Sequence, residues 1–310
     1  MDHEVSAGTP VREVAAEIAG RLAAAGVASP EVDARWLLDG VTGIDPYRTP
    51  ERALPEEHLD ALQAAVARRV AREPLQLIVG STDFRGLQLI CRPRVFIPRP
   101  ETEVVAGVAI AAATARRRRS AREQPSDPVR LVDVCTGSGA IACCLAVEVA
   151  GALVIATDRD PAAVRLTEDN LARVREGQAG VPGFAPGSDA EVVRGELLDG
   201  LDPALRGHLD VVVANPPYLP ASDRTTWEPE VADHDPDAAL VGGPDGHEVV
   251  DALLHLAVVW LAPGGAVVVE IDERRAAEAV EVARRVGLVD VEVVDDLTGT
   301  PRCVVAKRSR

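Results

Sequence analysis

The residues with the clearest capacity for chemistry are Asn215-Pro216-Pro217-Tyr218, which directly follow the aliphatic run 211–214. The two prolines fix the backbone and donate no hydrogen bonds, so the carbonyl groups of Asn215 and Pro216 can both accept from one NH2 group. An amide-type nitrogen is a poor nucleophile because its lone pair is delocalised, and two fixed acceptors would orient it and draw electron density toward it. We therefore predict that Asn215, Pro216 and Tyr218 are catalytic, with the Tyr218 ring offering a flat face. Pro217 is predicted to complete the substrate-binding surface.

A second pattern is typical of a cofactor-binding turn. The segment 131–141 leads from a hydrophobic run into a helical stretch through a turn that contains Gly137 and Gly139. Glycines there let backbone N–H groups at a helix N-terminus approach a ligand closely. Asp133 precedes the turn, where a carboxylate can hold the ammonium of an amino-acid-bearing cofactor, a group that NAD lacks. The glycine spacing also differs from the GxGxxG of dinucleotide-binding proteins.

Two further acids follow at the ends of later runs. Asp158 comes 19 positions after Gly139, close to the separation of roughly 20 at which an acid meets ribose hydroxyls, although it could instead cap a helix beginning near Pro161. Glu196 could accept from an adenine amine while Leu197 covers the ring, although acids followed by aliphatic residues are common. With the glycine turn, these residues favour S-adenosylmethionine. The predicted cofactor residues are Asp133, Thr136, Gly137, Ser138, Gly139, Asp158, Glu196, Leu197 and Asn215.

Bringing these motifs together requires a sheet whose strands end at one edge. After about residue 130, short aliphatic runs alternate with helical stretches, which predicts a parallel-rich, doubly wound α/β sheet. Ligands bind at the carboxyl edge of such sheets, and both motifs would lie there. The first 72 residues are rich in alanine with helical spacing, which predicts a small helical bundle.

The chain between these regions has a strand-like pattern. The runs Leu75–Val79 and Leu87–Cys91 are broken by Gly80 and by Arg85-Gly86, which predicts a β-hairpin. We expect a helical domain over residues 1–73, the hairpin connector over 74–100 and the cofactor-binding domain over 101–310.

Composition excludes several classes of protein. The 310 residues are 47% hydrophobic and 26% charged, as in folded globular proteins, and no run approaches the ~20 apolar residues of a membrane span, so we expect a cytoplasmic protein. The net charge of -16 argues against direct binding of nucleic acid. The basic cluster Arg116–Arg119 is interpreted as a solvated helix end. Five cysteines without a CxxC pair argue against a disulfide framework or a zinc site, and no metal is expected.

Longer motifs extend over nearly the whole chain and identify a resemblance. They resemble those of the release-factor glutamine N5-methyltransferases, the HemK or PrmC family of class I methyltransferases. The motifs that carry the resemblance are Pro74–Gly80, Val95–Glu103, Asn215–Tyr218, Pro229–Val231 with Asp235-Pro236, Gly242–Gly246 and Asp296–Gly299.

The resemblance implies a Rossmann-like, seven-stranded sheet with a small N-terminal helical domain and a connecting hairpin. It implies S-adenosylmethionine as cofactor, peptide-chain release factors as partners, and the glutamine of their Gly-Gly-Gln motif as methyl acceptor. By matching position, Asn215–Tyr218 would grip the glutamine amide, while Thr136–Gly139, Asp158 and Leu197 would hold the cofactor. Phe96 and the segment Pro98–Glu103 would wall the site, although Phe96 could equally be a core aromatic.

The sequence departs from the family pattern in three places. Cys135 stands where the family usually has glycine, and the segment 272–275 replaces a glutamine that usually follows the strand ending at Ile271. His234 precedes Asp235. A cysteine keeps the backbone donors of the turn, so these differences bear on the substrate more than on the chemistry.

Three other functions remain open from the residues. A paralogue could methylate a planar nitrogen, amide or guanidinium, of a free small molecule such as an amino acid, with the acids after Tyr218 holding a cation. A DNA adenine methyltransferase would need a basic recognition domain, which the composition does not supply. A non-catalytic binding module would have no need of both intact motifs.

Overall fold

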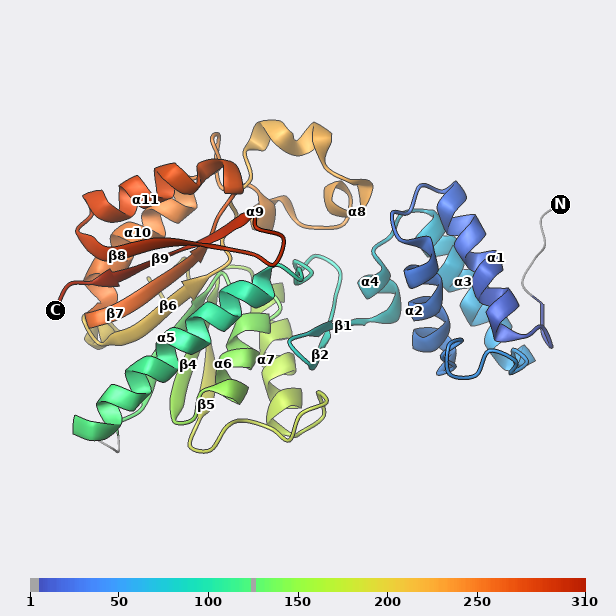
Figure 1. Cartoon of the computed structure of the whole chain (residues 1–310), viewed down its shortest axis with the longest axis horizontal. Coiled ribbons are helices and arrows are strands. Elements are labelled where there is room, and N and C mark those ends of the chain that lie inside the picture. The colour runs from blue at the N-terminus through green and yellow to red at the C-terminus, as the bar shows by residue number, and fades with distance from the viewer. Residues whose placement is uncertain (1–5, 124–126) are drawn as a thin grey trace. The chain divides into compact units, whose positions relative to one another are not determined.

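The computed structural model describes residues 6–123 and 127–310, so residues 1–5 and 124–126 of the predicted helical and cofactor-binding domains lie outside the described residues. The chain forms two compact units (Figure 1). The helical unit comprises Met1–Ser81 and Trp227–His234, and the sheet unit comprises Thr82–Thr226 and Asp235–Arg310.

The helical unit is built on amphipathic helices around one apolar core. Pro30 occupies the first turn of its helix, and Gly43 ends that helix in the left-handed conformation with φ of 68°. Buried Ile18, Leu37 and Leu62 come from three different helices of this core. The helices of the unit are α1 (Val11–Ala24), α2 (Pro30–Thr42), α3 (Leu59–Val70), α4 (Leu75–Val79) and α8 (Pro229–Ala232), with a 3-10 turn at Glu56–His58.

The run Leu75–Val79 is a helix, so the prediction of a strand there was wrong. Pro74 precedes α4, and Gly80 ends it with φ of 81° and an N–H donated to the Gln76 carbonyl. Leu75 and Ile78, one helical turn apart, pack on the core of the helical unit. A run of five residues, four of them apolar, is too short for its periodicity to separate helix from strand. The contact of Leu75 and Ile78 with this core favours the helix.

The segment Trp227–His234 joins the helical unit although it follows the Asn215 motif in sequence. Arg69, which is 6% exposed, donates to Asp33 at 2.7 Å and to Glu230 at 2.8 Å. Arg72 donates to both carboxylate oxygens of Glu230, at 2.7 and 2.6 Å. Burial alone would raise the pKa of Glu230, but the hydrogen bonds from Arg72 and Arg69 outweigh it and lower that pKa to about 2.

The sheet unit contains, among the described residues, a seven-stranded sheet in the order β5-β4-β3-β6-β7-β9-β8. All its pairs are parallel except those of β9, which runs antiparallel to β7 and β8. The expected α/β, Rossmann-like class is confirmed. The strands are β3 (Val129–Val134), β4 (Ala152–Asp158), β5 (Asp189–Arg194), β6 (Leu209–Ala214), β7 (Leu261–Glu270), β8 (Leu288–Asp295) and β9 (Pro301–Arg308).

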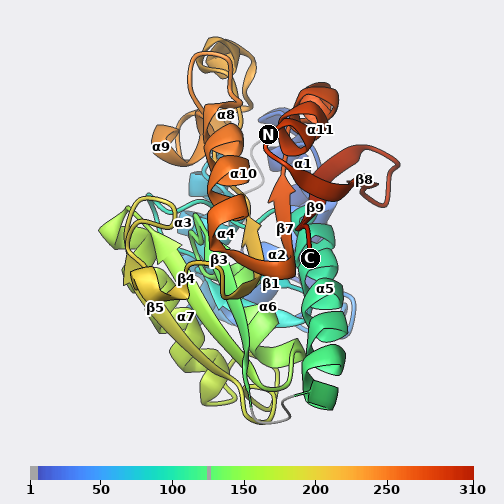
Figure 2. The same cartoon turned by 90° about the vertical axis from the view of Figure 1, so that its left-hand side faces the viewer.

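Helices cover both faces of this sheet (Figure 2). One face packs on α5 (Thr102–Glu123), α6 (Ala140–Glu148) and α7 (Pro161–Arg175), and the other on α10 (Glu248–Trp260) and α11 (Ala276–Arg285). A short helix α9 (Asp237–Leu240) and 3-10 turns at Pro203–Leu205, Ala221–Thr226 and Glu273–Arg275 complete the unit. A separate two-stranded sheet, β1 (Ser81–Phe84) and β2 (Leu87–Ile90), turns at Arg85-Gly86, where both residues have positive φ.

Strand register brings the ends of the central strands together. Val134 at the end of β3 pairs with Thr157 of β4 and with Ala214 of β6. Ala214 in turn pairs with Val269 of β7. The residues that follow these positions therefore emerge side by side at the carboxyl edge of the sheet. Among the described residues, no helix is long and apolar enough to cross a membrane.

Candidate functional site

The glycine turn after β3 uses its two glycines for different purposes. Gly137 has φ of 59°, and a side chain built there would meet no atom within 4 Å, so its backbone faces open space. Gly139 has φ of 80°, and a Cβ there would lie 2.8 Å from Thr167 of α7. Gly137 thus leaves room beside the turn for a ligand, although its N–H donates to Asp158 and its carbonyl accepts from Thr167. Gly139 lets α6 and α7 pack closely.

Cys135 opens this turn in a conformation that favours glycine. Its φ is 56° although it carries a side chain, which costs of the order of 1 kcal/mol or more. A positive φ at this position also explains why the family that the sequence resembles usually has glycine there. Cys135 lines the pocket described below, so its side chain also narrows that cavity.

The Asp133 side chain is buried in the sheet unit, and one of its two carboxylate oxygens has no hydrogen-bond partner among the described residues. The residue is 1% exposed. Its Oδ2 accepts from the Thr136 hydroxyl at 2.6 Å and from the Ala142 N–H at 3.0 Å, while its buried Oδ1 accepts no hydrogen bond from any described residue. Burial raises the pKa of Asp133 to about 7. A buried acceptor without a partner is costly, and a cationic ligand group in the pocket would relieve that cost.

Asp158 ties the end of β4 to the glycine turn. Its Oδ2 accepts from the Gly137 N–H at 3.0 Å, and its Oδ1 accepts from the Asp160 N–H at 2.9 Å. The helix cap of α7 is provided by Asp160, which accepts from the Ala162 N–H at 2.8 Å. Burial raises the pKa of Asp158. Because the capping role belongs to Asp160, Asp158 retains its other lone pairs for a ligand.

The Asn215 motif is held by a chain of hydrogen bonds. Asn215 follows β6, whose six residues are all buried, and its Nδ2 donates to the Thr102 hydroxyl at 3.1 Å. Thr102 donates to Oε2 of Glu270 at 2.8 Å, and the Tyr218 hydroxyl donates to Oε1 of Glu270 at 3.1 Å. Glu270 ends β7 and is 1% exposed, and burial raises its pKa to about 7.

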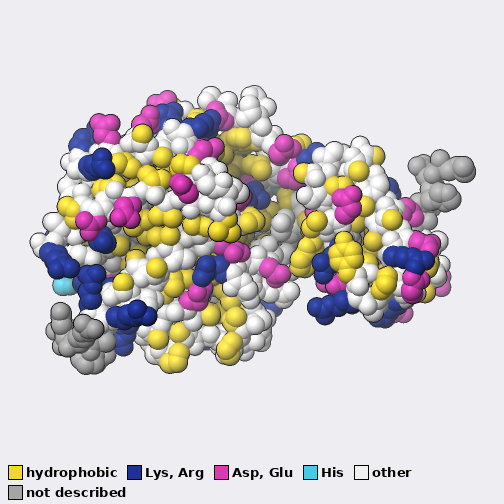
Figure 3. Space-filling view, in the orientation of Figure 1, with side chains coloured by type: hydrophobic (Ala, Val, Ile, Leu, Met, Phe, Trp, Pro, Cys, Tyr) yellow, Lys and Arg dark blue, Asp and Glu magenta, His cyan; other side chains and the backbone are white. Residues whose placement is uncertain are grey.

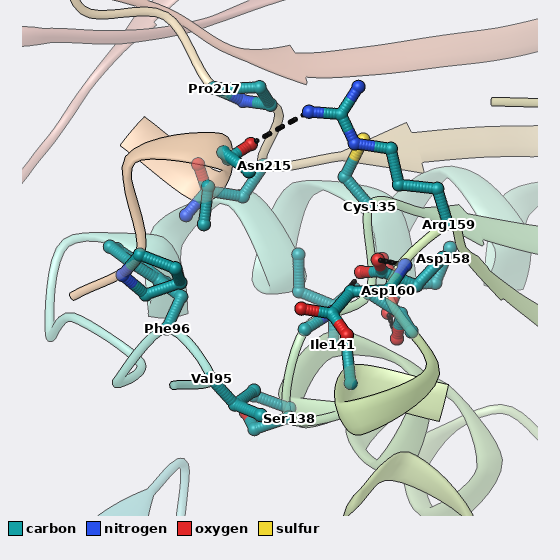
Figure 4. Close-up of a pocket in the computed structure, with 18 of the residues that line it drawn as sticks. Val95, Phe96, Cys135, Ser138, Ile141, Asp158, Arg159, Asp160, Asn215 and Pro217 are labelled. Carbon is teal, nitrogen blue, oxygen red and sulfur yellow. Dashed lines mark hydrogen bonds between the residues drawn. The ribbon is translucent and has the colours of Figure 1, made fainter. Parts of the chain in front are cut away.

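One pocket in the sheet unit collects most of the predicted site. Figure 4 shows Phe96 and Asn215 on one side of it and Asp158 and Cys135 on the other. Arg99 lies 5.1 Å over the Phe96 ring and pairs with Asp235. The predicted residues that line the pocket are Phe96, Asp133, Thr136, Gly137, Ser138, Asp158, Glu196, Leu197, Asn215 and Pro217.

Three predicted residues, Gly139, Pro216 and Tyr218, are not among those that line it. Tyr218 lines a smaller cavity together with His247 and Ile271. Thr102 lines the pocket as part of the predicted wall segment Pro98–Glu103, and Cys135 lines it from the glycine turn. Several residues without a sequence prediction also line it, among them Ile141, Arg159, Asp160, Pro236, Ala238 and Val249.

Asp158 offers a direct test of the cofactor-binding side. Asp158→Asn is expected to weaken cofactor binding by about 1.5–3 kcal/mol, because charge-assisted hydrogen bonds are lost. The amide introduced by this substitution also places an NH2 group against one of the two backbone donors from which the carboxylate accepted, Gly137 and Asp160. Calorimetric titration with S-adenosylmethionine measures the loss.

Asp202→Asn is the matched control for this substitution, because the Asp202 carboxylate, like that of Asp158, accepts from the backbone N–H two residues further on. That donor is Ala204, at 2.9 Å, and the turn is exposed. Equal affinities in Asp158→Asn and the wild type would remove Asp158 from the cofactor site.

Comparisons with known proteins find relatives over nearly the whole chain. Residues 13–80 match the family model of the PrmC N-terminal domain. The chain is 41% identical over 290 residues to the release factor glutamine methyltransferase of Mycolicibacterium smegmatis, covering 93% of this chain and 94% of the relative. It is 39% identical over 303 residues to the protein of the same name from Deinococcus radiodurans, covering 96% and 99%.

Among solved structures, the hMettl16 catalytic domain in complex with a MAT2A 3'UTR hairpin is similar with a TM-score of 0.51 and 14% identity, over 84% of each chain. That likeness concerns the fold alone. The fold is that of the class I methyltransferases, which use S-adenosylmethionine. The chain belongs to the release factor glutamine methyltransferase family.

Proposed function

We propose that this protein transfers a methyl group from S-adenosylmethionine to the side-chain amide nitrogen of the glutamine in the Gly-Gly-Gln motif of peptide-chain release factors. The observation that carries the proposal is the position of Asn215. Strand register puts it beside the glycine turn, and both line one pocket. A release-factor substrate would also place the reaction in the cytoplasm.

The residues of the pocket fit the cofactor. Asp133 presents a buried, unpartnered oxygen that would hold the ammonium group, and Gly137 leaves open space beside the turn. Asp158 would accept from the ribose hydroxyls, with Glu196 and Leu197 around the adenine. The bound cofactor supplies a methyl group on a sulfonium whose leaving group is a neutral thioether.

The Asn215 side would prepare the acceptor nitrogen. With its NH2 group turned to Thr102, Asn215 presents its carbonyl oxygen as an acceptor. The Pro216 carbonyl is proposed as the second acceptor, so that both N–H bonds of the substrate amide are aligned. Phe96 and Pro217 would restrict the acceptor to a flat group. Tyr218 would act from outside the pocket lining, through its hydrogen bond to Glu270.

Four of the five acids within residues 228–237 give no support to a small cationic substrate. Glu228 and Glu230 pair with arginines of the helical unit. Asp235 pairs with Arg99, and Asp237 pairs with Arg224. Since these carboxylates already have cationic partners within the chain, they are poorly suited to hold a free guanidinium.

The basic cluster gives equally little support to a nucleic-acid substrate. Arg116 donates to Asp210 at 2.6 Å, and Arg117 donates to the Asp127 carbonyl at 3.1 Å. On much of the face drawn in Figure 3, basic and acidic side chains lie among each other. This mixture does not resemble the continuous basic surface of a nucleic-acid binder.

The test is methylation by the purified protein with labelled S-adenosylmethionine. One reaction contains an unmodified release factor, and parallel reactions contain free glutamine, asparagine or arginine. Mass spectrometry is expected to find a single added methyl group on the glutamine of the Gly-Gly-Gln peptide. Label in a free amino acid, with the release factor unmodified, would instead establish the small-molecule alternative.

A further inference from the structure

The buried carboxylate of Glu270 lies beside the Asn215 motif although it does not line the pocket. Ala214 pairs with Val269 in the parallel β6–β7 register, so the next residues lie side by side: Asn215 directly follows β6, and Glu270 ends β7. Thr102, the first residue of α5, is 3% exposed and bridges them. Three separate elements thus converge on one buried hydroxyl group.

The protons of this cluster can be assigned from its chemistry. An ionised carboxylate only accepts hydrogen bonds, and a threonine hydroxyl has a single proton to donate. Since Thr102 gives that proton to Glu270, it can only accept from Asn215. The amide of Asn215 must then turn its NH2 group to Thr102, which leaves its oxygen free to point elsewhere.

We propose that Glu270 and Thr102 are positioning residues that hold the Asn215 amide with its oxygen, and not its NH2 group, presented to the methyl acceptor. The assignment rests on the proposed function, because only an acceptor at Asn215 can align a substrate NH2 group. If the hydrogen bond between Thr102 and Asn215 were reversed, the Asn215 NH2 group would face the NH2 group of the substrate, and both groups are donors.

The position of Glu270 supports a role beyond stability. A carboxylate that is 1% exposed is costly to ionise, yet its two oxygens accept from Thr102 and Tyr218, both beside the pocket motif. Burial raises the pKa of Glu270 to about 7, opposed by these hydrogen bonds and by Arg302, while Glu101 adds to the rise. Cys303 of β9 also faces Glu270. Glu270 therefore gains and loses its negative charge near neutral pH, and with that charge the hydrogen bonds that it accepts from Thr102 and Tyr218.

The experiment compares Thr102→Val with Thr102→Ser. Valine has the shape of threonine without a hydroxyl, whereas serine keeps it. Thr102→Val is expected to lower the single-turnover methylation rate by about tenfold or more, since the orienting hydrogen bond is lost. Thr102→Ser is expected to restore the rate to within about threefold of wild type. S-adenosylmethionine affinity should change less than the rate in both.

Glu270→Gln tests whether Thr102 and Tyr218 must both donate their hydroxyl protons to residue 270. Glutamine offers one acceptor and one donor where Glu270 offers two acceptors, so at least one of the two hydroxyl groups must reverse. We expect a reduced rate at saturating cofactor. In the wild type the methylation rate should fall as pH drops through about 7, because protonated Glu270 can donate to Thr102. In Glu270→Gln this fall of the rate with decreasing pH should be weaker.

Thr42→Val controls for the loss of a buried threonine. Thr42 lies in the helical unit and donates to the Leu38 carbonyl at 2.6 Å, so this variant should lose stability but keep its rate per folded molecule. If Glu270→Gln does not fold, the comparison of Thr102→Val with Thr102→Ser still tests the positioning role. An active wild type matched by Thr102→Val, with an unchanged pH profile, overturns this assignment alone. A wild type that leaves the release factor unmethylated overturns the proposed substrate, and this assignment with it.

Discussion

Asn215→Ala is expected to lower the single-turnover rate of methyl transfer by about a hundredfold to a thousandfold, the usual effect of removing one preorganised group that acts at the reacting centre. S-adenosylmethionine affinity should change little, because its predicted contacts lie mainly on Asp133, the glycine turn and Asp158. The side chain of Asn215 is held by its hydrogen bond to Thr102, a single neutral contact, so the fold should remain intact. Thermal melting, cofactor titration and single-turnover methylation on the same preparation measure all three.

The chain's other asparagine provides the contrast. Asn170 is fully buried and makes three hydrogen bonds, to the N–H and carbonyl of Ile90 and to the Ser138 carbonyl. Asn170→Ala should therefore reduce stability much more than Asn215→Ala. Asn215→Asp keeps the shape and an acceptor, but it cannot donate to Thr102 and adds a charge near Glu270, so it should also be slow. A near-normal rate in Asn215→Ala would mean that the chemistry belongs to another residue.

Much of the fold could be predicted because the core strands are short, apolar and regularly separated by helical stretches. Such a pattern has few solutions other than a layered α/β sheet. The α4 segment could not be assigned, because five residues, four of them apolar, fit either a helix or a strand until their neighbours are known. The pairing of Arg69 and Arg72 with Glu230 was also beyond prediction, since nothing local specifies a contact between residues so distant in sequence.

The candidate site was accessible from sequence where its residues follow strands. Asp133, Asp158 and Asn215 each lie near, at or just after the end of a buried run, and parallel strands bring such positions to one edge. Thr102 was anticipated only as part of the wall segment Pro98–Glu103. Glu270 carried the same signal as Asp158, an acid at the end of an aliphatic run, but which hydroxyl groups it meets depends on the packing of α5 against β7.

Asp133→Asn is expected to raise the free energy of unfolding of the cofactor-free protein and to lower its affinity for the cofactor. Its ordinary pKa is 3.8, and burial raises that to about 7, so folding favours the protonated, neutral form. The contribution of Asp133 to stability is therefore greatest below about pH 4 and is lost as pH rises through about 7. An asparagine at position 133 can keep both hydrogen bonds, from Thr136 and from Ala142, on its single oxygen, and it carries no charge.

The cofactor-free variant should therefore have a higher free energy of unfolding than wild type at pH 8, by on the order of 3 kcal/mol, with a much smaller difference at pH 5. Its NH2 group would occupy the place of Oδ1, the oxygen that accepts from no described residue, and would face a cofactor ammonium with a donor instead of an acceptor. S-adenosylmethionine affinity should fall by at least about tenfold. Chemical denaturation at both pH values and calorimetric titration test the two effects on one preparation. Because a purely structural carboxylate would give the stability gain without the loss of affinity, cofactor binding that is unchanged in Asp133→Asn would exclude Asp133 as the ammonium ligand.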